Sequence, residues 1–166
     1  MKPIHVSIEV SQPREQVYDF LDVMANHESF NDHFMVDWRC SGPERGLGSR
    51  ARVQTRGAIG ADEIDITVVS VRAPEMIMEE NVGAGGRRHA TGIYTLEELP
   101  GGGTRVVFEY AWRRAPLGER VAAPLVRAFV RREVERAMRR LAGRLAADRT
   151  AEAKPATAGR GRAPRG

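Results

Sequence analysis

The chain has 166 residues, about the size of one domain, and its 42% apolar and 29% charged residues are typical of a globular protein rather than a disordered or fibrous one. A single cysteine, Cys40, excludes an internal disulfide and a cysteine-rich zinc site, and it favours a reducing, cytoplasmic location. No run of about 18 apolar residues is present, so we expect neither a membrane-spanning helix nor a signal peptide.

The net charge of +4 arises from the C-terminal end of the chain. Residues 149–166 carry five basic side chains and one acidic side chain, whereas residues 1–148 carry 21 of each sign. The end is rich in Ala, Gly, Pro and Arg, and it has no large apolar residue after Leu145. Such a segment buries too little surface to offset its ordering entropy. We therefore expect one domain over 1–147 and a disordered basic tail over 148–166.

The N-terminal third predicts a strand followed by two short helices. Residues 4–10 alternate apolar with polar side chains, the period of a half-buried strand. Pro13 suits a first helical turn, and from Val17 apolar residues recur at i, i+3, i+4 and i+7. Residues 26–33 fit a second short helix.

Residues 35–113 predict five or six antiparallel strands joined as a meander. Apolar and β-branched runs are separated there by turn residues at 42–43, 57–60, 73–74, 83–86 and 100–103. In the clearest strand, 104–113, the even positions from Val106 to Trp112 are large and apolar, whereas Arg105 and Glu109 face the other way. A sheet with one apolar face needs a covering layer.

A long C-terminal helix supplies that layer. Pro124 begins or kinks this helix. The helix carries an apolar stripe that is expected to pack on the sheet, formed by Val121, Leu125, Phe129, Val130, Val134, Ala137, Met138, Leu141 and Leu145.

The order of these elements, together with several short motifs, resembles the START-like superfamily, and specifically the polyketide cyclase/dehydrase type of SRPBCC proteins. The motifs are Ser11-Gln12-Pro13, Val17-Tyr18-Asp19-Phe20-Leu21, Gly46-Leu47-Gly48-Ser49-Arg50, Gly92-Ile93-Tyr94-Thr95-Leu96 and Gly102-Gly103-Thr104-Arg105-Val106. The resemblance implies an α+β helix-grip fold, in which a curved antiparallel sheet of six or seven strands wraps around the long helix and leaves a cavity. Members bind lipids, sterols, quinones or polyketides, and only some are enzymes, so the fold does not settle the function.

We predict that this cavity binds a small hydrophobic, lipid-like or polyketide-like ligand. Strand alternation places aromatic, methionine and charged side chains on one face; the alternative for the aromatic residues is ordinary core packing. Arg88 and Glu80 would form a buried ion pair or hold a polar ligand group, unless they are an exposed cross-strand pair. The predicted lining is Trp38, Met78, Glu80, Arg88, Tyr94, Phe108, Tyr110, Trp112, Leu125 and Phe129, with Met76 on the same face.

The alternative function is that of a polyketide aromatase/cyclase, which promotes aldol condensation and dehydration. The resemblance suggests that a cavity arginine, tyrosine or histidine would act, and Arg88, Tyr94 and Tyr110 are the candidates. His27, Asp32 and His33 lie in the segment that borders the cavity mouth in START-like proteins. We interpret these histidines as solvated, with a general acid/base role as the alternative; their spacing does not fit a metal site. No cofactor is expected.

A third interpretation makes the arginine-rich helix and tail a docking surface for RNA or an anionic membrane, as in START-like proteins that associate with ribosomes or membrane quinones. The arginines lack interleaved aromatic residues for base stacking, so specific nucleic-acid binding is not expected. The sequence does not indicate an oligomeric state.

Overall fold

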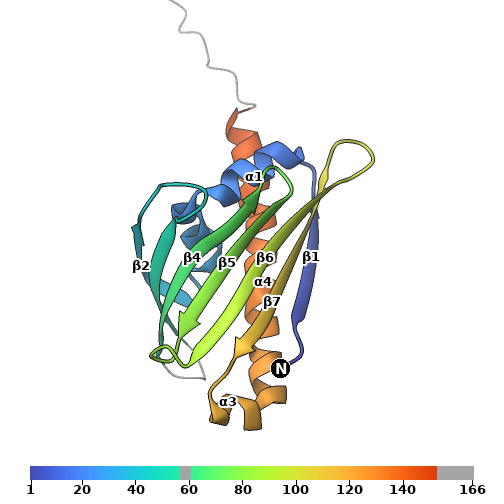
Figure 1. The fold of residues 1–166 in the computed structure, drawn as a ribbon. Helices are drawn as coiled ribbons and strands as arrows, with labels where there is room; N and C mark the ends of the chain where they lie inside the picture. Colours follow the sequence, from blue (N-terminus) through green and yellow to red (C-terminus); the bar gives the residue numbers. More distant parts are fainter. Residues whose placement is uncertain (57–60, 153–166) are drawn as a thin grey trace, which may run out of the picture.

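Seven antiparallel strands form one sheet in the order β1-β7-β6-β5-β4-β3-β2 within the part of the chain that the computed structural model describes (Figure 1). That part is residues 1–56 and 61–152, with the backbone alone for 148–152. The elements are β1 (Ile4–Val10), α1 (Arg14–Asp22), η1 (Met24–His27), α2 (Glu28–Asn31), β2 (Met35–Ser41), β3 (Arg50–Thr55), β4 (Glu63–Arg72), β5 (Met76–Gly83), β6 (Arg88–Glu98), β7 (Thr104–Arg114), α3 (Leu117–Val121) and α4 (Ala123–Glu152).

This arrangement confirms the predicted α+β helix-grip fold. Helix α4 runs along one face of the sheet and contacts α2, while α1 contacts β5, β6 and η1 (Figure 1). The predicted turns at 42–43, 73–74, 83–86 and 100–103 each lie between consecutive strands. Strand β1 is added at the far edge beside β7, from Ile4 opposite Tyr110 to Val10 opposite Thr104.

The core lies between the sheet and α4. Val134, Ala137, Met138, Leu141 and Leu145 of α4 are buried, as the apolar stripe predicts.

The prediction is wrong at the N-terminal end of the apolar stripe, because Val121 and Leu125 are 82% and 76% exposed. The chain ends α3 and begins α4 around Ala122 and Pro124, and this change of direction brings Val126 to the core instead.

The start of the predicted disordered tail is helical. Helix α4 continues through Glu152, so residues 148–152 are helical rather than disordered. The rest of the predicted tail, 153–166, and the predicted turn at 57–60 lie outside the described residues. Among the helices that are described, none has the length and apolar character needed to cross a membrane.

Candidate ligand-binding cavity

An apolar cavity lies between the inner face of the sheet, α4 and the α2 segment. Its volume is about 120 Å³, whereas a void that holds one water molecule needs only about 10–15 Å³. The space is therefore much larger than a packing defect. The aromatic side chains that line it are Phe30, Phe34, Trp38, Tyr94, Phe108, Tyr110, Trp112 and Phe129.

Two buried ionisable side chains meet on one wall of the cavity. Glu79 lies in the middle of β5, and His27 ends η1. His27 Nδ1 is 3.3 Å from Glu79 Oε1, and His27 Nε2 is 2.7 Å from the carbonyl oxygen of Leu21. The side chains are 3% and 6% exposed for His27 and Glu79, respectively, so both are shielded from solvent.

The contacts of His27 define where protons reside in this pair. Because the Leu21 carbonyl oxygen only accepts hydrogen bonds, Nε2 must carry a hydrogen and Nδ1 faces the carboxyl group. At zero net charge the pair holds one further proton, which either Glu79 or Nδ1 carries. Burial raises the pKa of Glu79, and the charge of His27 partly opposes that effect. Glu79 therefore keeps its proton to a higher pH than an ordinary glutamate does.

Polar groups beside Glu79 add hydrogen-bonding capacity to this wall. Asn81 lies two residues along β5 on the same face, is buried and lines the cavity. Glu79 Oε1 makes no hydrogen bond with any other described residue, because its contact with His27 has the distance of an ion pair without hydrogen-bond geometry. The wall can thus accept or donate a hydrogen bond to a ligand.

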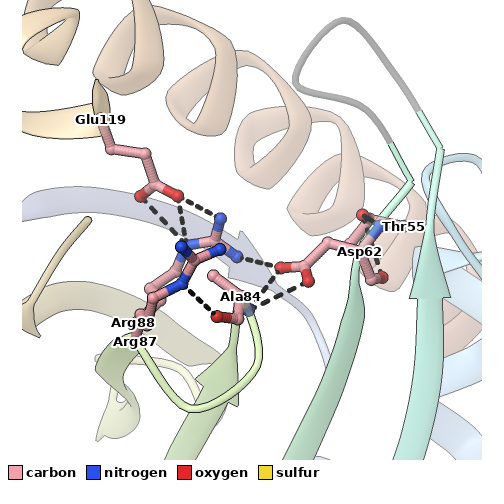
Figure 2. Close-up of polar contacts among 6 residues, drawn as sticks. All are labelled: Thr55, Asp62, Ala84, Arg87, Arg88 and Glu119. Carbon is pink, nitrogen blue, oxygen red and sulfur yellow. Dashed lines mark hydrogen bonds and ion pairs between the residues drawn. The ribbon is translucent and has the colours of Figure 1, made fainter. Parts of the chain in front are cut away.

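A second charged cluster, centred on Arg88, also lines the cavity, and Figure 2 shows its contacts. Arg88 Nη1 donates to Asp62 Oδ2 at 2.6 Å, and Nε donates to both carboxylate oxygens of Glu119 at 3.0 Å. Nη2 also pairs with Glu119. Burial lowers the pKa of Arg88, but Glu119 and Asp62 outweigh that effect and raise it.

These contacts contradict the predicted Glu80–Arg88 pair. Glu80 is 49% exposed and lies 3.6 Å from His89 on the outer face of the sheet. Arg88 instead pairs with two carboxylates, one from Asp62 just before β4 and one from Glu119 of α3.

Tyr94 and Tyr110 extend the inner face between the two clusters. The Tyr94 ring lies edge-on to His27, with ring centroids 5.7 Å apart, and Tyr110 lies edge-on to Trp112 at 4.9 Å. Burial raises the pKa of Tyr94, with the charge of Glu79 adding to the effect. Burial also raises the pKa of Tyr110 to about 12. Both phenols therefore stay protonated near neutral pH and act as hydrogen-bond donors.

The structure brings together seven of the ten side chains predicted to line the cavity. Met78, Glu80 and Leu125 do not line it: Leu125 is exposed, and the inner face of β5 carries Ile77, Glu79 and Asn81. The seven are Trp38, Arg88, Tyr94, Phe108, Tyr110, Trp112 and Phe129. Whether these seven contact a ligand stays a prediction.

The error in predicting which face of β5 points into the cavity has a simple cause. Gly83 pairs with Arg88 across the turn, so odd-numbered residues of β5 face even-numbered residues of β6, as Glu79 faces Gly92. A prediction that continues the even numbers of β6 across the turn places the two methionines of β5 on the inner face, and these residues make that face look apolar in the sequence. The signal that was missed is the parity of the hairpin.

The interpretation of the histidines as solvated is also wrong. His27 lines the cavity, and the His33 side chain is 3% exposed, with Nε2 3.2 Å from the Glu133 carbonyl oxygen of α4. Burial lowers the pKa of His33. Asp32 pairs with Arg140. Of the three residues, only His27 lines the cavity described here.

An antiparallel sheet that holds a long helix, with an apolar cavity between them, defines the protein as one of the helix-grip class. Residues 1–146 match the model of the family described as polyketide cyclase/dehydrase and lipid transport, and the chain belongs to this family. The search of curated proteins gave no match.

Solved structures share this fold at low sequence identity. The ZhuI aromatase/cyclase from Streptomyces sp. R1128 is 15% identical, with 92% of this chain and 98% of that chain covered and a TM-score of 0.74. TTHA0849 from Thermus thermophilus is 16% identical, with 89% and 99% covered and a TM-score of 0.69. Ara h 8.0201 is 11% identical, with 88% and 98% covered and a TM-score of 0.64.

Proposed function

We propose that the protein binds a small, neutral, hydrophobic ligand of lipid-like or polyketide-like character in the cavity. The observation that carries this proposal is the combination of an aromatic lining with a few polar groups, among them the Glu79–His27 pair and the Arg88 cluster. Ligand sites in proteins are mostly apolar concavities in which a few polar groups fix orientation. The family's description as cyclase/dehydrase and lipid transport supports the same conclusion.

The charges around the cavity favour a neutral ligand over a carboxylate. Arg88 is paired with two carboxylates, so it has no charge left to offer an anion. The Glu79–His27 pair has no net positive charge when it holds its one further proton. Arg56 also lines the cavity but is exposed. An anionic group that entered deeply would lose its hydration without gaining a cation, which is costly.

Matched probes and matched variants test this proposal. We expect 2-acetylnaphthalene to bind at least about tenfold more tightly than 2-naphthoate, which has the same ring system with a carboxylate, by isothermal titration calorimetry. Ala137→Leu, which adds carbon atoms inside the cavity, should weaken ketone binding by about tenfold or more. Ala128→Leu makes the same change on an exposed face of α4 and should leave binding unchanged.

Two results would contradict the proposal. One is that neither the wild type nor the Ala128→Leu variant binds the ketone or carries any apolar ligand in native mass spectra. The other is equal binding by the Ala137→Leu variant while its circular dichroism spectrum stays that of the wild type.

A second candidate function, a polyketide cyclase/dehydrase, is favoured specifically by the Glu79–His27 pair. Dehydration of a β-hydroxy ketone removes a proton from the carbon beside the carbonyl and releases the hydroxyl group as water. In its ionised form Glu79 would take the carbon-bound proton, and it would then return that proton to the departing hydroxyl. Tyr94, Tyr110 or Asn81 would donate a hydrogen bond to the carbonyl oxygen.

Glu79→Gln separates the two functions. The substituted amide preserves the side-chain volume, so ketone binding should stay within about threefold of the wild type. An amide cannot transfer the proton, so formation of dehydrated product from a poly-β-ketone mimic should fall by about 100-fold or more. If wild-type protein gives the same product profile as buffer, the catalytic function fails and the binding function is unaffected.

A further inference from the structure

Three large apolar side chains are exposed at one end of the molecule. Leu117, Val121 and Leu125 are 73%, 82% and 76% exposed, and together we call them the apolar tip. They are half of the six large apolar residues that are exposed in the described chain, and they fall within nine consecutive residues. Such clustering indicates an interaction surface, whereas single exposed apolar residues do not.

The apolar tip spans α3 and the first residues of α4. Ala122 N donates to the Gly118 carbonyl and Val126 N donates to the Ala122 carbonyl, both at 3.0 Å, and the backbone leaves helical geometry at Ala122, where α3 ends. In Figure 1 this segment projects beyond the lower end of the sheet, at the opposite end of α4 from Glu152.

Arginines gather beside the apolar tip. Arg113, Arg114 and Arg120 line one hollow together with Met1 and Trp112, and no acidic side chain of the described residues lines it. All three arginines are exposed, and none has an ion pair with another described residue. The nearby carboxylate of Glu119 does not neutralise them, because it is held by Arg88. An uncompensated positive hollow thus adjoins an exposed apolar surface.

We propose that this end of the molecule docks on an anionic phospholipid membrane. Apolar side chains that enter the acyl region beside arginines that contact phosphate groups are the two attractions that hold a peripheral protein at a lipid surface. This proposal does not depend on the cavity function. It does place the docked surface next to the cavity, since Glu119 of α3 and Val126 of α4 line the cavity wall from the same segment.

The same observations disfavour the other occupants. Nucleic acid would use the arginines, but it would leave three aliphatic side chains against a hydrated phosphate backbone, with no exposed aromatic residue among them for base stacking. A twofold contact with a second copy would bury the aliphatic side chains, but it would also bring the two sets of arginines together. An anionic lipid surface satisfies both components.

Vesicle co-sedimentation of the full chain tests the proposal. Wild-type protein should bind vesicles of phosphatidylcholine with about 30% phosphatidylglycerol more tightly than vesicles of phosphatidylcholine alone, and salt should weaken the binding. Replacing the apolar tip by serine (Leu117→Ser, Val121→Ser, Leu125→Ser) should lower the partition coefficient by about tenfold or more. Arg113→Gln, Arg114→Gln and Arg120→Gln together should lower it by a similar factor and reduce the salt dependence.

The control variant carries serine at Leu47, Val69 and Val71, the other exposed large apolar residues, and should bind as the wild type does. The basic end of the chain is present in every variant, so differences between variants report on the apolar tip and the arginines. The proposal is wrong if the tip variant binds vesicles as well as the control, or if the wild type binds neither vesicle. It is also wrong if the tip variant instead converts a dimer to a monomer in light scattering.

Discussion

Glu79 is the residue whose environment departs furthest from its ordinary chemistry. A carboxyl group that is 4% exposed among aromatic rings is costly to ionise, and its one ion-pair partner in the described structure is His27. Nothing in the sequence letters marks it, because Glu79 and Glu80 are adjacent and only the strand parity decides which one is buried. The distinction between the two glutamates therefore provides a matched experiment.

Glu79→Gln should make the protein relatively more stable as the pH rises. Burial raises the folded-state pKa of Glu79. Its contribution to stability is therefore fully present below the unfolded pKa, about 4.5, and is lost as the pH rises through the folded pKa. Glutamine cannot ionise, so the melting temperature of the variant relative to the wild type should increase between about pH 4 and pH 8, by about 2 °C or more.

Glu80→Gln is the control for that experiment. Glu80 is half exposed and pairs with His89 across the outer face of the sheet, and a surface pair contributes little to stability. Its melting temperature relative to the wild type should change little over the same pH range. Parallel pH profiles of the wild type and the Glu79→Gln variant would mean that Glu79 does not titrate differently in the folded state.

Elements follow from the sequence pattern more reliably than the contacts between them. The alternation in β1 and β7 and the apolar repeat of α4 depend only on local periodicity, and the structure confirms them. The parity of β5 and the start of α4 depend on how one element passes into the next, and both predictions were wrong. The Arg88 cluster also depends on how separate elements meet, because it joins β6 to α3 and to the segment before β4.

Arg88→Met should destabilise the protein by about 3 kcal/mol, because it leaves the carboxylates of Asp62 and Glu119 without their cation in a mostly buried place. Arg52→Met is the matched control. Arg52 also contacts a carboxylate through two hydrogen bonds, to Asp65 at 2.7 and 3.1 Å, but both side chains are about half exposed. The loss of Arg52 should lower the stability far less in urea denaturation, because solvent screens an exposed ion pair. Equal effects of the two variants would show that the Arg88 cluster is not shielded from solvent.

At the scale of the whole molecule, the sequence predicts the fold and the inner face of β6 and β7, but not the chemistry of the cavity. Turn residues and strand periods define the meander, and β6 and β7 carry the correct inner face, including Tyr94, Phe108 and Tyr110. The Glu79–His27 pair joins residues 52 positions apart in sequence, through a register that no local pattern specifies. The charge pattern also predicts a boundary near residue 147, since the neutral body and the basic C-terminal end differ in composition.

Deleting residues 153–166 should leave the domain intact while it changes the protein's charge. Leu145 is the last buried side chain that the structure describes in α4; its carbonyl oxygen accepts a hydrogen bond from Gln12 Nε2 at 2.8 Å, and the family model ends at residue 146. The melting temperature should therefore stay within about 1 °C of that of the full chain, and the dissociation constant for the ketone within about twofold.

The shortened chain keeps 22 basic and 22 acidic side chains, so its retention on a cation exchanger at pH 7 should fall sharply. Vesicle binding by the shortened chain should weaken, because the deletion removes positive charge. In the shortened chain the serine variant of the apolar tip should still bind less than its control, because the apolar tip lies at the other end of α4. A fall in melting temperature of more than about 5 °C would instead mean that residues 153–166 contribute to the folded domain, which would overturn its assignment to 1–147.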